Sequence, residues 1–195
     1  MNTGDARSEI MRSIRAHLAM SAPSADPSVR ASLCSSVAEL PKVSLVQLFK
    51  QNLEAVDGHC MVVDSQTEVE ETVTRLTEGK SIANADASRS DLFKFDVGIT
   101  SAQAGIAETG TLVLDSTVER NRLVSLVPPV HIAILDASRI HQTLGETLTA
   151  LQSGEEVSPA ITFITGPSRT ADIELTMAIG VHGPQELYVV INQNA

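Results

Sequence analysis

Residues 165–174 read T-G-P-S-R-T-A-D-I-E and follow the apolar run I-T-F-I at 161–164. The apolar run is typical of a buried strand, and residues 173–179 contain enough apolar side chains for a short packed helix. A strand, a glycine turn and a helix N-terminus together present free backbone N–H groups and the positive end of the helix dipole. The side chain of Arg169 can contact a carboxylate or phosphate through two hydrogen bonds. The stretch therefore predicts a site for an anion.

The same stretch also fits a simple tight turn. Gly166 and Pro167 are residue types that set a bend, and the hydroxyl of Ser168 or Thr170 can cap the helix that follows. From the chemistry of the residues alone, the anion site and the structural turn both remain open.

The composition favours an α/β fold with a mostly parallel sheet flanked by helices. The chain has 195 residues, of which 43% are hydrophobic and only 3% are aromatic. The core therefore depends on Val, Ile, Leu and Ala, which suits parallel strands that are buried on both faces. The net charge of −10 disfavours a surface for nucleic acid or anionic membranes, although a local site can still bind a small anion.

Several other classes of protein lack their sequence signals here. The two cysteines, Cys34 and Cys60, do not make an iron–sulfur or zinc framework, and no other metal-ligand spacing stands out. The chain contains no dinucleotide-binding, Walker A or nucleophile-elbow motif, so the cofactor is unknown. No signal peptide is apparent, and no apolar run approaches the ~20 residues of a membrane helix. We therefore expect a cytoplasmic protein without membrane insertion.

The chain is expected to divide into an N-terminal extension and an α/β domain. Residues 5–18 predict a helix, because apolar side chains recur there at fourfold spacing. Residues 20–42 are rich in Ser, Ala and Pro, as in a linker. The extension is thus 1–42 and the α/β domain 43–195. The helix could dock on a neighbouring protein or cap its own domain, and a homo-oligomer is possible.

Strands and helices are expected to alternate along the α/β domain. The predicted helices are 44–56, 65–78 and 140–152. The predicted strands are 59–63, 81–83, 97–99, 111–114, 130–135, 160–164 and 187–191. A capping-box signature, S-Q-T-E at 65–68, opens the second helix. This helix joins two strands, which predicts a right-handed β-α-β unit that ends at 81–83. Residues 100–105 are expected to form a small-residue turn, and residues 111–135 a hairpin-like segment.

Glu108 is the candidate catalytic residue. It lies in I-A-E-T-G-T-L-V-L at 106–114, directly before a strand. A carboxylate among apolar and small residues is costly unless it is paired, hydrogen-bonded or functionally used. Glu108 could act as a nucleophile or as a general acid or base. The alternative, which the spacing favours, is that it accepts backbone N–H bonds and fixes the turn around Gly110.

Arginine and histidine residues supply further candidates. Arg120 and Arg122 are typical of a solvated face, but either could reach an anion bound in the glycine turn. His131 begins a buried strand, where a lone histidine is more often structural than catalytic. His182 lies in the rigid turn G-V-H-G-P. Because that turn precedes a strand, we expect it at the amino end of the sheet, away from the usual ligand crevice, unless it folds over the site.

Four segments together resemble the lactate utilization protein C family, which contains the LUD domain. They are I-T-S-A-Q-A-G-I-A-E-T-G-T-L-V-L at 99–114, S-L-V-P-P-V-H-I-A-I-L at 125–135, T-G-P-S-R-T-A-D-I-E at 165–174 and G-V-H-G-P at 180–184. The resemblance implies a fold related to ribose-5-phosphate isomerase and the CoA-transferases. It also implies a role in bacterial oxidation of L-lactate to pyruvate, beside two partner proteins that carry iron–sulfur clusters. CoA-transferases of related fold use a glutamate near a glycine turn, and Glu108-Thr109-Gly110 is similar to it.

Three hypotheses follow from these observations. In the first, the chain is a subunit of an L-lactate oxidation system that works with iron–sulfur subunits and binds a small carboxylate or another small anionic ligand. Glu108 then orients the ligand, and the binding residues are Gly166, Ser168, Arg169, Thr170, Thr109, Gly110 and His182. In the second, the chain is a stand-alone CoA-transferase-like or phosphosugar-type enzyme that uses Glu108. In the third, it is a non-catalytic assembly or regulatory module.

Overall fold

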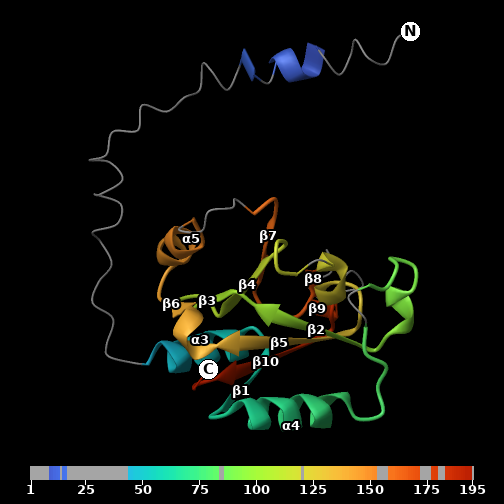
Figure 1. Ribbon diagram of the computed structural model, residues 1–195, viewed down its shortest axis with the longest axis vertical. Helices are drawn as coiled ribbons and strands as arrows, with labels where there is room; N and C mark the ends of the chain where they lie inside the picture. Colours follow the sequence, from blue (N-terminus) through green and yellow to red (C-terminus); the bar gives the residue numbers. More distant parts are fainter. Residues whose placement is uncertain are drawn as a thin grey trace. The chain divides into compact units, whose positions relative to one another are not determined.

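The computed structural model describes most of the α/β domain and a short part of the extension. The described residues are 9–13, 15–16, 44–83, 86–119, 121–152, 158–171, 177–179 and 183–194. The chain separates into two compact units, 1–42 and 43–195 (Figure 1). In the first unit, the described residues are helical, as expected for part of the helix over 5–18, and Ile10 and Met11 are exposed.

The first sheet of the domain has four parallel strands, which confirms the expected α/β class. Its strands, in spatial order, are β1 (His59–Val63), β10 (Glu186–Asn192), β5 (Val130–Asp136) and β2 (Val97–Ala102). The strand expected at 81–83 is reduced to a single bridge between Ile82 and Val97, at the β2 edge. The chain after β1 therefore crosses the whole sheet, and the predicted β-α-β unit does not join neighbouring strands.

One face of this sheet is covered by helix α4 (Gln66–Thr77). Ser65 caps the helix as expected, since its hydroxyl accepts a hydrogen bond from the Glu68 amide at 3.3 Å. The apolar stripe of α4, which includes the buried Val69, packs on alternate residues of the sheet such as Ile132 and Val190. In Figure 1, α4 lies at the bottom of the view, directly beneath these strands.

The opposite face packs against helix α3 (Leu45–Ala55) and a second sheet. The second sheet has the spatial order β6 (Ile140–His141), β3 (Ala104–Ile106), β4 (Thr111–Asp115) and β7 (Ile161–Ile164). Between the sheets lies the main core, whose largest fully buried side chains are Phe49, Leu53, Leu112, Leu135, Leu187 and Ile191. Helix α5 (Leu144–Gln152) covers the far face of the second sheet, where Leu151 packs on the buried residues of β3 and β4.

Most of residues 100–105, the expected small-residue turn, lie in strands: 100–102 end β2 and 104–105 begin β3, with only a bend at Gln103 between them. Gly105 lies in β3, and a Cβ atom built there would be 2.9 Å from the Leu135 side chain of the first sheet. The small side chains therefore allow the two sheets to approach closely. The hairpin expected at 111–135 is also wrong. β4 pairs antiparallel with β3 and β7, whereas β5 belongs to the first sheet.

The helix expected after the T-G-P-S-R-T stretch is wrong for the residues that the structure describes. Strands β8 (Arg169–Ala171) and β9 (Met177–Ile179) pair antiparallel there. The expected helix at 140–152 begins later, because β6 occupies its first two positions. Three short 3₁₀ turns complete the described elements: η1 (Leu92–Lys94), η2 (Arg122–Ser125) and η3 (Ala137–Arg139).

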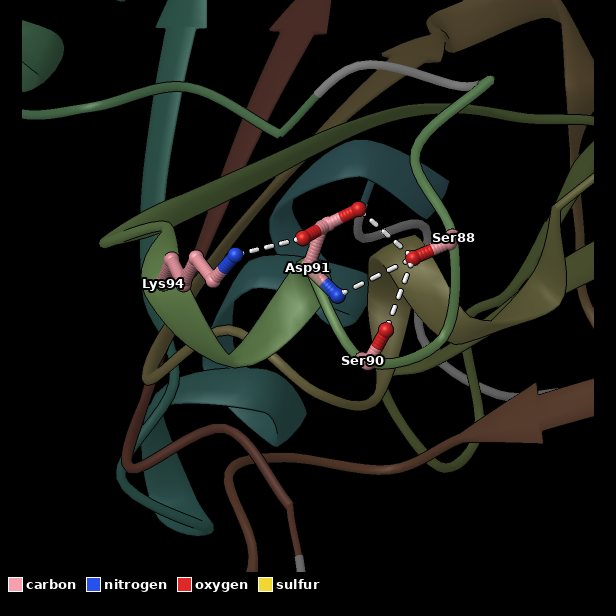
Figure 2. Close-up of polar contacts among 4 residues, drawn as sticks. All are labelled: Ser88, Ser90, Asp91 and Lys94. Atoms are coloured by element: carbon pink, nitrogen blue, oxygen red, sulfur yellow. Dashed lines mark hydrogen bonds and ion pairs between the residues drawn. The ribbon is translucent and has the colours of Figure 1, made fainter.

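A polar cluster opens η1 at the edge of the domain (Figure 2). The Ser88 hydroxyl donates to Asp91 Oδ2 at 2.6 Å, lies 2.9 Å from the Ser90 hydroxyl, and accepts from the Asp91 amide. Lys94 forms an ion pair with Asp91 at 2.6 Å and lowers the pKa of that carboxyl. These contacts stabilise the turn that buries Leu92.

Candidate functional site

A cavity of about 230 Å³ opens where β5, β10 and β7 meet two loops. The residues that line it are Ser125, Leu126, His131, Thr162, Phe163, Ile164, Thr165, Gly166, Ser168, Gly183, Pro184 and Leu187. Hydroxyl, apolar and backbone groups make up most of this lining. Among these described residues none carries a carboxylate, an ammonium or a guanidinium group. The cavity can therefore offer hydrogen bonds to a small ligand in a largely uncharged setting.

The cavity lies at the amino ends of the parallel strands. His131 and Leu187 are each the second residue of their strand, and they are register partners. The sequence predicted the turn before β10 at this amino end of the sheet. Gly183 and Pro184, which belong to that turn, line the cavity.

His131 is the most unusual residue in the lining. The side chain is fully buried, and its Nε2 atom lies 2.8 Å from the hydroxyl oxygen of Thr100 on β2. Its Nδ1 atom has no hydrogen-bond partner in the part of the chain that the structure describes. Burial lowers the pKa of His131 from 6.5 to about 4, so the imidazole is neutral at physiological pH. The expected structural role therefore accounts for only one of the two ring nitrogens.

The sequence did not indicate His131 as a cavity residue, because its position and its partner depend on the tertiary structure. Alternation along β5 places His131 on the same face as Ala133 and Leu135, which points toward the second sheet. A polar ring on an apolar face was the available signal. Only the strand register, which sets Gly98 of β2 beside His131 and Thr100 two residues further on, shows the partner of the ring.

Gly98 brings another polar group to the cavity. A Cβ atom at Gly98 would lie 1.9 Å from the carbonyl oxygen of Val124, so only glycine lets η2 rest on β2 at this point. This close approach places Ser125 in the lining, where it is 1% exposed. Its hydroxyl donates to the Arg122 carbonyl at 2.8 Å and can still accept a hydrogen bond.

The loop after β7 forms the next part of the wall. Gly166 has a φ of +84°, and a Cβ atom there would meet Val56 of the α3 C-terminus at 2.9 Å. The Ser168 amide donates to the Pro184 carbonyl at 2.8 Å, which ties this loop to the turn before β10. Gly166 and Ser168, both predicted ligand residues, are therefore brought together in the lining.

Arg169 is directed to a different partner. Its guanidinium group forms an ion pair with Asp57 Oδ2 at 2.6 Å, and the arginine does not line the cavity. Asp57 follows α3 and has a φ of 63°. The pair fastens the start of β8 to the end of α3. The helix expected over 173–179 was to supply a dipole beside Arg169, but its described residues, 177–179, form strand β9.

Glu108, Thr109 and Gly110 lie outside the cavity lining. Glu108 is exposed, and its carboxylate accepts a hydrogen bond from the Leu144 amide at 3.0 Å, which confirms the expectation that it accepts a backbone N–H. The donor belongs to the start of α5 rather than to the turn. Gly110 has a φ of 63° and packs against the backbone of α3.

A chain of hydroxyl groups connects this turn to the cavity wall. The Thr111 hydroxyl lies 2.7 Å from that of Thr109 and 2.7 Å from that of Thr165. Thr165 lines the cavity, so Thr109 reaches it only through this chain. Thr111 is buried and thus holds the two turns in a fixed relation.

The remaining predicted residues are His182, Thr170 and the two arginines that precede β5. His182 and Arg120 lie outside the described residues, and so does the side chain of Thr170. Arg122 is exposed and borders a neighbouring hollow with Asp115 and Glu119. This hollow shares Ser125 and Thr162 with the cavity.

Metal and thiol chemistry find little support in the described part of the chain. Its His, Cys, Asp and Glu side chains form no group of three that could hold a metal ion. Cys60 is buried and free, and burial raises the pKa of its thiol to about 12, which leaves it protonated and unreactive. Within the described residues, no helix has the length and apolar character needed to cross a membrane.

Comparison with known proteins identifies the family. The LUD domain family matches residues 82–191, which is more than half of the chain. The chain therefore belongs to the LUD domain family. Every described residue of the cavity lining falls inside the matched region.

Several curated proteins and one solved structure are similar to the chain. An uncharacterized protein of Neisseria meningitidis is 42% identical over 107 residues, which are 54% of this chain and 46% of that protein. The lactate utilization protein C of Exiguobacterium is 39% identical over 112 residues (55% and 49%), and that of Halalkalibacterium halodurans is 44% identical over 101 residues (49% and 44%). The chain spans about half the length of these relatives.

The structural comparison concerns the fold alone. The crystal structure of a DUF162 family protein from Deinococcus radiodurans superimposes with a TM-score of 0.60. The match covers 78% of this chain and 98% of that chain at 22% sequence identity. It agrees with the α/β architecture described above.

Proposed function

We propose that this LUD-domain chain acts in lactate utilization, as a cytoplasmic subunit of a bacterial L-lactate oxidation system that works with iron–sulfur partner proteins. Its cavity holds a small anionic ligand, for which a small carboxylic acid is the natural class. The partners carry the clusters, and this chain contributes ligand binding. The division into an extension over 1–42 and a domain over 43–195 fits this role, with the extension available for docking or for assembly into a homo-oligomer.

One observation supports the proposal most strongly. The segment that matches the LUD domain family, 82–191, is also the segment that supplies the cavity, and several relatives of the chain are named lactate utilization protein C. A cavity of about 230 Å³ is small for a nucleotide and ample for an acid of a few carbon atoms. The lining residues that the structure describes carry no carboxylate, ammonium or guanidinium group, which disfavours a ligand with two or more negative charges, because burying such charge without a cation is costly.

The binding residues of this proposal are Gly166 and Ser168, with Thr165 beside them in the wall. Arg169 is a positioning residue, because it acts on the wall through Asp57. Glu108 contacts α5 and lies outside the lining, which favours the lactate role over a stand-alone CoA-transferase-like enzyme that uses this glutamate.

Ligand binding tests the first part of the proposal. We would measure the thermal stability of the full chain with L-lactate, pyruvate, inorganic phosphate and CoA. A ligand that binds only the native state raises its stability by about 2.7 kcal/mol at a hundredfold excess over the Kd. We expect stabilisation by at least one of the two carboxylic acids and none by CoA. A shift with CoA alone, lost in Glu108→Gln, would support the stand-alone enzyme instead.

A matched pair of variants defines the role of Arg169. Arg169→Gln and Asp57→Asn break the same ion pair from opposite ends, and asparagine tolerates the φ of 63° at position 57. If Arg169 only positions the wall, both variants weaken acid binding by a similar, small factor. A loss confined to Arg169→Gln would show that the guanidinium contacts the ligand directly.

The system role needs a separate measurement. Deleting the gene in its native host should abolish growth on L-lactate, and the full chain should restore it and co-purify with iron–sulfur proteins. Normal growth of the deletion strain on L-lactate contradicts the proposed role. Restoration by a chain that lacks residues 1–30 would show that the extension is not needed for assembly.

A further inference from the structure

We propose that His131 and Thr100 form an adaptable hydrogen-bonding pair that binds either the hydroxy or the oxo form of a small carboxylic acid, the imidazole changing tautomer between the two. This inference rests on the proposed function, because it takes the cavity to be the acid site. It goes further by assigning the oxygen next to the carboxylate to a specific atom, Nδ1 of His131.

The geometry of the pair is the first argument. Nε2 of His131 lies 2.8 Å from Oγ1 of Thr100, and both side chains are buried, with 0% and 4% exposure. Nδ1 is buried without a partner among the described residues. A buried nitrogen without a partner is unfavourable, so a ligand that supplies the missing hydrogen bond binds more tightly.

The chemistry of the neutral ring is the second argument. A neutral imidazole has one N–H donor and one acceptor nitrogen, whereas a threonine hydroxyl can either donate or accept. When the Thr100 hydroxyl donates to Nε2, Nδ1 carries the proton and donates to an oxo group. When Nε2 carries the proton and donates to Thr100, Nδ1 accepts from a hydroxyl group. The same pair therefore satisfies both members of a hydroxy acid and oxo acid couple without any change in charge.

The distribution of burial orients the ligand. His131 lies at the buried end of the cavity, whereas Thr165 is exposed and Ser168 is partly exposed. A carboxylate keeps its hydration more easily at the open side, near these hydroxyl groups. The uncharged oxygen of the acid then faces the imidazole. In this orientation, an acid with a hydroxyl or oxo group next to the carboxylate binds more tightly than a simple fatty acid.

Access to the ring requires a small movement of the lining. The imidazole is closed to solvent, but Leu126 and Phe163 in the same lining are 39% and 44% exposed. Exposed side chains change rotamer rapidly, so these two can part to admit a ligand and then cover it. Their apolar surface would be removed from water in the closed state.

Nuclear magnetic resonance of the full chain tests the proposal. The ring nitrogens of His131 are observed by long-range proton–nitrogen correlation, without ligand and with L-lactate, pyruvate or propionate. Propionate is the control, because it has the carboxylate but no oxygen on the carbon next to it. We expect the proton on Nδ1 with pyruvate and on Nε2 with L-lactate, while propionate leaves the ring as in the free protein.

The outcomes separate this inference from the proposed function. If L-lactate and pyruvate shift the resonances of Gly166 and Ser168 but the His131 tautomer is the same in both complexes, the adaptable pair is wrong and the acid site stands. If neither acid shifts any resonance of the lining, both the pair and the acid site are wrong. A protonated ring in either complex also overturns the pair.

A conservative pair of variants adds an affinity readout. Thr100→Ser keeps a hydroxyl group next to Nε2, whereas Thr100→Val keeps the shape and removes the hydroxyl group. We expect Thr100→Ser to bind both acids as the natural chain does, and Thr100→Val to lose about tenfold in affinity for at least one of them. If Thr100→Val binds both acids with the affinities of the natural chain, the proposal is wrong.

Discussion

Two glycine turns pack against the C-terminal half of the same helix, yet only one of them faces the cavity. Gly110 has a φ of 63° and lies against the backbone of Asn52 and Leu53, whereas Gly166 has a φ of 84° and lies against Val56. Each turn places a left-handed glycine where a side chain would collide with α3. Their local chemistry is similar, and the two turns are joined through the hydroxyl of Thr111.

The two turns differ in the strands that they adjoin and in the position of those strands in the second sheet. The turn at Gly110 leads into β4 at the centre of the second sheet, and its Glu108 caps α5. The turn at Gly166 follows the edge strand β7, whose residues line the cavity together with the turn. A turn of this kind thus becomes a structural element or a cavity wall according to its position between the sheets. Three measurements test this difference between the two turns.

The largest effect is expected for Gly110→Ala. A Cβ atom there would lie 2.3 Å from the Leu53 amide nitrogen, in a backbone conformation that alanine rarely adopts. Strain and displacement of α3 together should lower the free energy of unfolding by about 4 kcal/mol, measured by urea denaturation. Gly79→Ala is the control, because its φ is +71° but nothing lies within 4 Å. It should cost only about 1 kcal/mol. Equal losses would show that the contact with α3 is unimportant.

The next effect concerns the cavity side and depends on pH. Burial lowers the pKa of His131 to about 4 in the folded chain, against 6.5 for an unperturbed imidazole. Between these values the unfolded chain binds one proton more than the folded chain, so stability falls as pH drops. His131 should therefore contribute a loss of about 3 kcal/mol over this window. Urea unfolding against pH, compared with His131→Gln, isolates the contribution. A His131 ring that titrates near 6.5 in the folded protein would contradict it.

The smallest of the three effects is expected for Gly166→Ala, where stability and binding should separate. The added Cβ would meet the Val56 side chain and carbonyl at 2.9 Å, and the side chain can give way. We expect a loss of about 2 kcal/mol in unfolding free energy. Because the loop lines the cavity, acid binding should weaken as well, as measured by calorimetry. Gly110→Ala at a temperature where it is folded should bind as the natural chain does. Intact binding in Gly166→Ala would argue against Gly166 as part of the wall.

Local pattern was enough to predict most of the elements. Helix α4 begins at the predicted cap, Ser65, because capping depends on residues only three positions apart. The strand at 59–63 has the predicted bounds, and the longest apolar runs, those of β5 and β10, are strands as expected. These elements could be predicted because their burial requires only the periodicity of their own residues.

The errors occur where the outcome depends on residues far along the chain. Residues 173–179 have apolar side chains that suit a helix, but residues 177–179 form strand β9, which pairs with β8. Likewise, β4 and β5 are close in sequence and enter different sheets. Neither choice is encoded in a window of neighbouring residues, because pairing is decided by which strand edges and core faces are available.

The candidate site followed the same division. Gly166 and Ser168 were predicted and line the cavity, because turn chemistry marks them locally. Arg169 was also predicted as a ligand residue, but its guanidinium forms an ion pair with Asp57 and does not line the cavity. His131 gained its place from strand register with β2, and only this register brought Thr100 to its ring.

The amino-acid sequence by itself determined the α/β class, the extents of the main strands and helices, and the family to which the chain belongs. Those properties depend on periodicity, capping and turn residues, which act over a few positions. Only the tertiary structure decided which strands share a sheet, which of two similar glycine turns faces a cavity, and which buried nitrogen is left without a partner. These outcomes depend on packing between segments that are distant in sequence, which no local pattern of residues encodes.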